Sequence, residues 1–573
     1  MCGIAGIYSQ SEKINFIDVK KMTAAIKHRG PDATNYHNQG NYATGCARLS
    51  IVDRTIKSNI PYSFDSLVLS FNGEIYNFQE LRKILIKKNY KFHTMSDTEV
   101  VIKSFHYWGV NCFKKFEGMY ACAIFDKKND NLILARDPLG IKTLYYLSYK
   151  KSFFYSSEIK SFKKIKKLKL NKSKIYEWFL LNENYGEETL VDKVKKVLPG
   201  QILNFRGKKI TTTSFFSLLK TFKDKKIFKK NHIEKLLKEK TELHLCDKKV
   251  KSAFFLSGGL DSSLITAMMN RKIKLDNNKN LYSISGQIQF QALNETSYQK
   301  NVIQKSEIKK NISIKINKKN FLSESFKLMK HLEFPCFSPS LVGLNILFKN
   351  KIKKTKVVYT GDGADEIFLG YDWFQDSKPT NLKKMLNSIS YINEKTAKHI
   401  LRNKPKKLHC VLKKKLSSFS EINKFRYINQ RIYLQKWLLS RDVIGMLNST
   451  EVRVPYCDLS ILKFVNKISS ERLFDNKNKK ILLKNISKKY LSKDITDRKK
   501  IGFTIPIYEW LDKQAILFYF KKLKISDSNN YRKINIKKLL KEHFSKKKNH
   551  IRAIWTIISF EMWNKFFLND RRL

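Results

Sequence analysis

Short apolar runs alternate with polar turn signals over the first 205 residues, which predicts β-strands. Runs of this length, bounded by turn residues, are typical of a largely antiparallel layer. Two segments between the runs, 78–89 and 97–109, instead have the apolar spacing of helices. We therefore expect an α+β domain over residues 1–205. The predicted strands lie in 42–53, 66–77, 120–126, 131–137 and 152–158.

Beyond this region the pattern changes to strands that alternate with helices. Leu198-Pro199-Gly200 marks a turn, and residues 206–231, which end in the polar stretch FKDKKIFKKN, have the composition of a linker. The apolar runs SAFFLSGG, LYSISG and KVVYTGDG then each lead into a helical segment, the pattern of a parallel α/β sheet. From about residue 375 the chain is lysine-rich and helical in pattern. We expect a second domain over 232–573, an α/β parallel sheet with a helical C-terminal part.

The charge of the chain has two interpretations. Its 573 residues include 113 Lys and Arg against 50 Asp and Glu, a formal net charge of +63. Such a charge attracts phosphate, as in a nucleic-acid binder or a protein of anionic surfaces. Alternatively the composition is biased, because lysine, isoleucine, asparagine and phenylalanine are abundant together and the charge is spread thinly along the chain. We favour the second interpretation and expect no specific nucleic-acid partner.

Other features of the sequence indicate a cytoplasmic protein rather than a membrane or secreted one. There is no run of eighteen apolar residues that could span a membrane. The N-terminus lacks the basic leader and apolar stretch of a secretory signal. Eight scattered cysteines with no C-x-x-C pair fit a reducing compartment.

Cys2 directly follows the initiator methionine, which makes it a candidate nucleophile. If Met1 is removed, a thiol and a free α-amine share one residue. The amine, with an unperturbed pKa of ~8, can accept the thiol proton near neutral pH. Taken alone, a cysteine at this position could equally be an incidental surface residue.

Further motifs follow Cys2-Gly3-Ile4-Ala5-Gly6 in a fixed order through the N-terminal domain. Together with Cys2 they resemble the class II glutamine amidotransferases. The resemblance implies an N-terminal nucleophile fold, an antiparallel sheet sandwich with helices. The motifs are His28-Arg29-Gly30-Pro31-Asp32, Arg48-Leu49-Ser50-Ile51-Val52-Asp53, Asn72-Gly73-Glu74-Ile75-Tyr76-Asn77, Ser96-Asp97-Thr98-Glu99, Glu117-Gly118-Met119, Ala135-Arg136-Asp137 and Ser157-Glu158-Ile159-Lys160.

Glutamine carries a carboxylate, an ammonium and an amide, and these motifs contain a group for each. Arg48 offers a bidentate fork for the carboxylate. Asp97 suits the ammonium, with Glu74 nearby. The resemblance assigns stabilisation of the oxyanion to the Asn72 side chain and the Gly73 backbone N–H. The alternatives are a surface charge for Arg48, a hairpin turn at Asn72-Gly73 and a helix N-cap for Asp97.

A glycine-rich loop opens the second domain after an apolar strand. In Ser257-Gly258-Gly259-Leu260-Asp261-Ser262-Ser263 the glycines let the backbone approach phosphate, and Ser257 and Ser262 add hydroxyl donors at the start of a helix. The loop is neither a Walker A motif nor G-x-G-x-x-G. It resembles the loop of the ATP pyrophosphatases, which implies that Asp261 helps to hold Mg²⁺. The alternative is a glycine turn with no ligand.

A second loop, Thr360-Gly361-Asp362-Gly363-Ala364-Asp365-Glu366, packs three acids into five residues. Asparagine synthetases carry an equivalent loop, and the resemblance to them extends over roughly residues 2–510. It implies that Asp362 takes part in adenylate formation, that Asp365 and Glu366 bind the acceptor, and that Lys500 meets pyrophosphate. The implied contacts to ATP or pyrophosphate are Leu256, Ser257, Gly258, Gly259, Asp261, Ser262, Ile284, Thr360, Gly361 and Lys500.

The family reaction uses glutamine, ATP and Mg²⁺ to convert aspartate to asparagine. The chain departs from the family pattern mainly around the expected acceptor site, for example at Leu369 and Cys457. The acceptor therefore stays open between aspartate and another carboxylate, such as a sugar acid of a surface polysaccharide or a small metabolite. A third hypothesis is a non-catalytic, polyanion-binding relative. We expect small-molecule partners and a possible homodimer.

Overall fold

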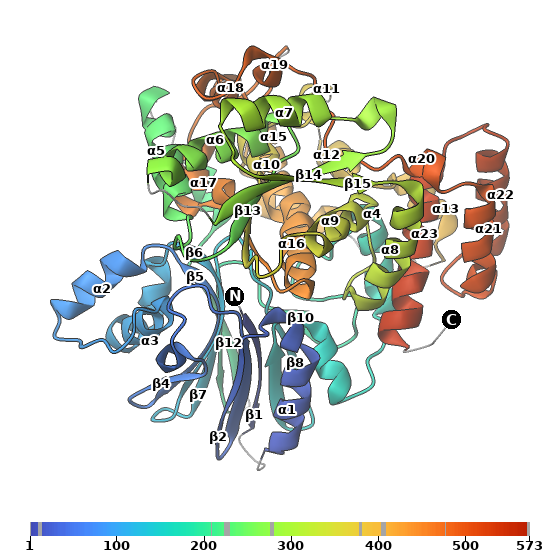
Figure 1. Cartoon of the computed structure of the whole chain (residues 1–573). Helices are drawn as coiled ribbons and strands as arrows, with labels where there is room; N and C mark the ends of the chain where they lie inside the picture. The colour runs from blue at the N-terminus through green and yellow to red at the C-terminus, as the bar shows by residue number, and fades with distance from the viewer. Residues whose placement is uncertain are drawn as a thin grey trace.

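The structure is a computed structural model that describes residues 2–9, 14–207, 209–222, 230–275, 280–376, 381–402, 408–475 and 477–569. Two six-stranded antiparallel sheets form the N-terminal part, and a five-stranded parallel sheet lies above them (Figure 1). The predicted combination of an antiparallel sandwich and a parallel α/β sheet is thus confirmed.

The first antiparallel sheet has the order β10-β8-β9-β1-β3-β2. Alternation along β1 sends Cys2, Ile4 and Tyr8 to the face that meets the second sheet, while Ala5 and Ile7 pack with α1 (Phe16–Ala25). The strands are β1 (Cys2–Ser9), β2 (Ala33–Gln39), β3 (Tyr42–Arg48), β8 (Tyr145–Tyr149), β9 (Ser152–Ser156) and β10 (Val194–Lys196).

The second antiparallel sheet has the order β12-β11-β7-β6-β5-β4. Val68 of β5 faces the first sheet, and Leu67, Leu69 and Phe71 pack with α2 (Phe78–Ile86) and α3 (Asp97–Trp108). The predicted linker begins within this sheet, because β12 pairs with β11, and its residues 223–229 lie outside the described part of the chain. The strands are β4 (Tyr62–Phe64), β5 (Leu67–Ile75), β6 (Gly118–Asp126), β7 (Asn131–Arg136), β11 (Gln201–Arg206) and β12 (Lys209–Ser214).

The third sheet is parallel throughout, with the order β15-β14-β13-β16-β17. From β13 the chain runs to β14 and β15 on one side, and then returns to β16 on the other side of β13. Such a reversal leaves a crevice at the carboxyl ends of the two central strands, where open α/β sheets bind ligands. The strands are β13 (Ser252–Phe255), β14 (Leu281–Ile288), β15 (Asn311–Ile316), β16 (Val357–Tyr359) and β17 (Glu451–Arg453).

Helices surround this sheet and make up the C-terminal region, whose last helices, α20 to α23, lie to the right in Figure 1. Among the described residues, no helix is long and apolar enough to cross a membrane. The remaining α-helices are α4 (Ile175–Leu181), α5 (Lys230–Leu243), α6 (Leu260–Leu275), α7 (Thr296–Lys305), α8 (Lys318–His331), α9 (Ser340–Lys349), α10 (Ala364–Phe368), α11 (Trp373–Asp376), α12 (Leu382–Ile389), α13 (Glu394–Ile400), α14 (Leu408–Leu416), α15 (Glu421–Ile428), α16 (Leu434–Leu447), α17 (Leu459–Asn466), α18 (Ile481–Ser487), α19 (Lys493–Thr496), α20 (Ile507–Trp510), α21 (Lys513–Lys522), α22 (Lys533–Phe544) and α23 (Ile551–Trp563).

Candidate functional site

Cys2 is the first residue of β1 and is 8% exposed between the two antiparallel sheets. Its backbone nitrogen donates a hydrogen bond to Asn72 Oδ1 at 3.1 Å. With Met1 attached this nitrogen is a peptide N–H, and it marks the place of the α-amine that removal of Met1 would create. Burial raises the pKa of the Cys2 thiol, so the thiol needs a nearby base to ionise.

Val68 and Asn72 are four positions apart on β5, so their side chains point to the same face of the strand. That face meets the first sheet, which places Asn72 opposite Cys2. Its side chain is fully buried, and its Nδ2 has no hydrogen-bond partner in the described structure. Oδ1 accepts the Cys2 nitrogen, so an unused N–H donor remains on the side chain that contacts the Cys2 backbone. A preorganised donor of this kind suits an oxyanion.

Gly73 follows Asn72 within β5, so the two residues belong to a strand and not to a hairpin turn. A Cβ at Gly73 would lie 2.4 Å from Met119 O and 2.6 Å from Tyr120 Cα. The pairing of β5 with β6 therefore leaves no room for a side chain beside the candidate oxyanion donor.

Arg48 ends β3 directly opposite Cys2 in the antiparallel register and is 5% exposed. Its guanidinium donates to Thr55 O at 3.0 Å, to Asn59 Oδ1 at 2.7 Å and to Ser58 Oγ at 2.7 Å. Within the described residues no carboxylate lies within 4.0 Å of it. Its terminal nitrogens also donate to Val52 O and Asp53 O. Arg48 is thus a buried cation without a carboxylate partner, and a glutamine carboxylate would have to replace some of its hydrogen bonds to protein oxygens.

Asp97 and Glu74 are the two acids near this centre, and their partners differ. Asp97 Oδ2 accepts the Ile75 N–H at 3.0 Å, and Ser96 rather than Asp97 is the N-cap of α3. Glu74 pairs with Arg453 of β17 at 2.9 Å. Burial raises the pKa of Asp97 to about 6 and that of Glu74 to about 8. Because Arg453 already neutralises Glu74, Asp97 is the acid better placed for an ammonium.

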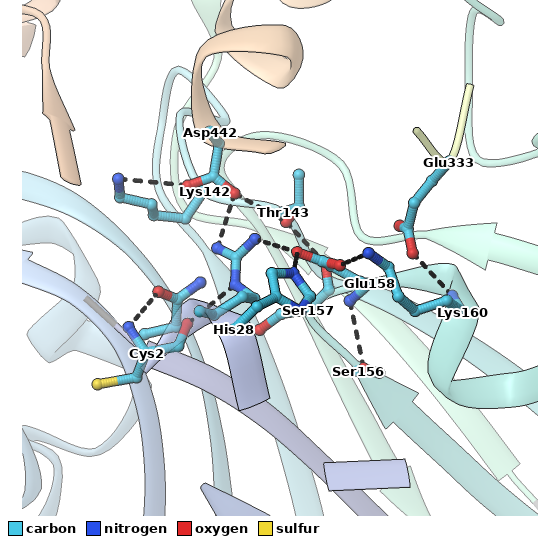
Figure 2. A network of polar contacts seen from close by, with 12 residues as sticks. Cys2, His28, Lys142, Thr143, Ser156, Ser157, Glu158, Lys160, Glu333 and Asp442 are labelled. Carbon is cyan, nitrogen blue, oxygen red and sulfur yellow. Dashed lines mark hydrogen bonds and ion pairs between the residues drawn. The ribbon is translucent and has the colours of Figure 1, made fainter. Parts of the chain in front are cut away.

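A buried network links Cys2 to the second domain (Figure 2). Arg29 Nε donates to Cys2 O at 3.1 Å, and its other two nitrogens contact Glu158 Oε1 and Asp442 Oδ2, each at 2.8 Å. Lys142 lies 3.5 Å from the same Asp442, which belongs to α16. No role was predicted for these residues, because they lie up to 413 positions apart and no local sequence pattern connects them.

A second centre is a cavity of about 950 Å³ where the two predicted loops meet at the ends of β13 and β16. The glycines of the first loop let the chain turn there, as shown by Gly258 with φ +81°. Gly258 is the one predicted nucleotide-site residue that does not line the cavity. The predicted residues that do line it are Leu256, Ser257, Gly259, Asp261, Ser262, Ile284, Thr360, Gly361, Asp362, Asp365, Glu366 and Lys500.

Two lysines hold the acids at one end of this cavity. Lys480 Nζ lies 2.6 Å from both oxygens of Asp261 and 2.6 Å from Asp365 Oδ1, and Lys500 also pairs with Asp365. These two ammonium groups hold the pKa of Asp365 well below its usual range, against the opposing effect of burial. Lys480 was missed in the sequence because nothing local separates it from the surrounding lysines.

Asp362, the first acid of the second loop, has a cationic partner of its own. Arg441 of α16 forms a bidentate pair with Asp362, through Nε at 2.7 Å and a terminal nitrogen at 2.9 Å. Asp362 Oδ2 also accepts the Thr360 hydroxyl at 2.7 Å. These contacts fix the orientation of the Asp362 carboxylate in the cavity, where the second loop meets α16.

The donor set in this cavity fits a magnesium ion that is shared with phosphate. Mg²⁺ in nucleotide sites is commonly bound by one or two carboxylates, with phosphates and water as the other ligands. Asp261 and Asp365 supply two carboxylates, and the Lys480 ammonium between them shows that they can share one cation. No cluster of three acidic, histidine or cysteine ligands occurs in the described ranges, so phosphate would have to complete the site.

Comparisons with known proteins agree with both centres. Residues 1–216 match the family described as "Glutamine amidotransferase domain", and residues 232–565 match "Asparagine synthase". The chain is 28% identical over 626 residues to "Asparagine synthetase [glutamine-hydrolyzing] 1" of Bacillus subtilis, covering 100% of this chain and 98% of the relative. It is 29% identical over 408 residues to "Putative asparagine synthetase [glutamine-hydrolyzing] 2" of Methanocaldococcus jannaschii, covering 65% of this chain and 76% of that protein. The chain therefore belongs to the asparagine synthase family of glutamine-hydrolysing ligases.

Proposed function

We propose that the chain transfers the amide nitrogen of glutamine to a carboxylate through an acyl-adenylate. Aspartate is the default acceptor, so the products are asparagine, glutamate, AMP and pyrophosphate. The observation that carries the proposal is the meeting of the two glycine-rich loops and their four acids at one cavity. The site around Cys2 supplies the nitrogen.

At the first centre, glutamine lies with its carboxylate on Arg48 and its ammonium near Asp97. Removal of Met1 frees the α-amine, which accepts the proton of the Cys2 thiol. The thiolate attacks the side-chain amide, and the oxyanion that forms receives hydrogen bonds from Asn72 Nδ2 and the Gly73 N–H. Ammonia leaves, and water hydrolyses the thioester to glutamate.

At the second centre, the backbone around Gly259 and the Ser257 and Ser262 hydroxyls bind phosphate oxygens. A carboxylate oxygen of the acceptor attacks the α-phosphorus of ATP, and pyrophosphate leaves toward Lys480 and Lys500. Ammonia then attacks the acyl carbon, and AMP leaves with the electrons of the C–O bond. When bound by Asp261 and Asp365, Mg²⁺ would offset negative charge on the phosphates.

A scan of acceptors tests this proposal. Purified protein receives glutamine, ATP and Mg²⁺ with one carboxylate at a time, and pyrophosphate and the new amide are both measured. We expect pyrophosphate release that depends on the acceptor, with aspartate giving asparagine. Glutamine turnover without pyrophosphate release for any carboxylate would contradict the proposal.

A sugar acid is the second candidate acceptor, by the same chemistry. Tyr371, Trp373, Tyr433 and Trp437 line the cavity and are each half-buried, which leaves ring surface toward a ligand. Aromatic surface of this kind can cover the apolar face of a ring-shaped acceptor. The same scan separates the candidates, because only one class of acid will release pyrophosphate.

A further inference from the structure

Lys436 is a buried cation at the aromatic end of the synthetase cavity. It belongs to α16, lines the cavity and is 3% exposed. Its Nζ donates one hydrogen bond, to Leu181 O at 3.3 Å. Among the residues that the structure describes, no carboxylate lies within ion-pairing distance of it.

The surroundings of Lys436 are unfavourable for an isolated ammonium. Its Nζ lies 4.2 Å from the centroid of the Tyr433 ring and 5.6 Å from that of Phe337. Burial lowers the pKa of Lys436 to about 7. Buried lysines without a counter-ion are rare because desolvation of the charge is costly, so such a group points to a binding role.

Glu366 of α10 is the complementary case in the same cavity. It is 3% exposed, and its Oε1 accepts the Tyr371 hydroxyl at 2.7 Å. It has no cation within 4.0 Å in the described part of the chain. After the charge of Glu183, the charge of Glu366 is the one that opposes the lowering of the pKa of Lys436 by burial, so Lys436 and Glu366 lie within electrostatic reach of each other.

Apart from the exposed Asp497, the other acids that line the cavity already have cationic partners. Asp261 and Asp365 are held by Lys480, Asp362 by Arg441, and Glu295 by Arg498 at 2.6 Å. Of the buried charged side chains that line the cavity, Lys436 and Glu366 are thus the two that the described structure leaves without an opposite charge.

We propose that Lys436 is a specificity-determining residue that binds a second, non-reacting carboxylate of the acceptor, while Glu366 receives the acceptor's ammonium. This inference rests on the proposed function. The acceptor would then be an amino dicarboxylate, with one carboxylate adenylated and the other held by Lys436. In a sugar acid with a single carboxylate, that carboxylate would be adenylated. Such an acceptor would offer no second carboxylate to Lys436 and no ammonium to Glu366.

The test combines changes in the protein with matching changes in the acceptor. Lys436→Met removes the ammonium and keeps most of the volume, and 3-aminopropanoate is aspartate without its α-carboxylate. Pyrophosphate release is measured for each pair of protein and acceptor. We expect Lys436→Met to raise the KM for aspartate on the order of 10- to 100-fold and to leave the KM for 3-aminopropanoate unchanged, since a charged hydrogen bond is lost only in the first case.

Lys351→Met is the matched control. Lys351 also has a pKa lowered by burial and a single hydrogen bond to a backbone carbonyl, Asn448 O at 2.9 Å, but it does not line the cavity. Its substitution should leave the KM for aspartate unchanged. Glu366→Gln is tested in the same way with succinate, which is aspartate without its ammonium. We expect the KM for aspartate to rise and the KM for succinate to stay unchanged.

The outcomes separate this inference from the function on which it rests. An unchanged KM for aspartate in Lys436→Met, or an equal rise for 3-aminopropanoate, overturns the role of Lys436. Pyrophosphate release with a sugar acid but not with any amino dicarboxylate also overturns it, although amidation would stand. No pyrophosphate release by the unmodified protein with any carboxylate would overturn the proposed function itself. Glutaminase activity of each variant shows that it is folded.

Discussion

At the scale of single residues, Asn72 combines two functions in one side chain. Its Oδ1 accepts the Cys2 nitrogen, and its buried Nδ2 has no partner in the described structure. An unpaired donor in the core is costly unless a ligand completes it. Under the proposed function, Asn72 would position the nucleophile through Oδ1 and supply Nδ2 as a donor to the oxyanion.

Asn72→Asp should separate these two functions. The aspartate keeps an oxygen for the Cys2 nitrogen but loses the N–H donor, so we expect kcat for glutamine hydrolysis to fall about 10²- to 10³-fold. Steady-state glutaminase assays measure this. Asn204→Asp in β11 is the control, since Asn204 Oδ1 is also without a partner but lies outside both sites. Equal kcat values for Asn72→Asp and the unmodified protein would contradict the oxyanion role.

The buried Lys436 side chain should also make the stability of the folded protein depend on pH. The pKa of Lys436 is about 7 in the folded protein and close to the usual lysine value of 10.5 in the unfolded chain. Between these pH values the unfolded chain binds the extra proton, so the contribution of Lys436 to stability improves as pH rises from 7 to 10.5. We expect Lys436→Met to be more stable than the unmodified protein at pH 7, with the difference shrinking toward pH 10. Thermal unfolding midpoints at several pH values measure it, and a difference that grows with pH would refute it.

At the scale of elements, α16 connects the two centres. It carries Lys436 and Arg441 toward the synthetase cavity, and Asp442 toward Arg29 and thus toward the Cys2 carbonyl. Because Arg29 and Asp442 are both fully or nearly fully buried, their ion pair is shielded from solvent. A shift of α16 would therefore change the positions of side chains at both sites.

Asp442→Asn should destabilise the protein by about 3 kcal/mol, because it leaves the buried Arg29 short of one counter-charge. The thermal unfolding midpoint measures the loss. Glu239→Gln is the control: the Lys235–Glu239 pair is 3.8 Å long and largely exposed, so it contributes no more than about 0.5 kcal/mol. Similar midpoints for the two variants would contradict the importance of the buried pair.

The elements themselves were largely predictable, and the contacts between them were not. Short apolar runs between turn signals predicted the strand that carries Asn72, although β1, which carries Cys2, was not among the predicted strands. The loop residues after β13 and β16 follow local rules of glycine and helix starts. The pairing of Lys480 with Asp261 joins residues 219 positions apart, and no local pattern encodes it. The predicted residue roles and the division of the chain into domains stay predictions.

At the scale of the whole molecule, buried ion pairs connect the amidotransferase part to the synthetase part. Arg29 pairs with Asp442, and Glu74 pairs with Arg453. Both pairs begin within the immediate surroundings of Cys2 or Asn72. These pairs hold the two centres in a fixed relation, as the proposed transfer of nitrogen from one centre to the other would require.

The most direct test of this account follows the nitrogen atom itself. The protein receives glutamine labelled with ¹⁵N in the side-chain amide, together with ATP, Mg²⁺ and aspartate, and mass spectrometry and pyrophosphate assays follow the products. We predict labelled asparagine and pyrophosphate in equal amounts, and no labelled product from Cys2→Ala. Labelled product from Cys2→Ala, or pyrophosphate formed without label in the new amide, would contradict the account.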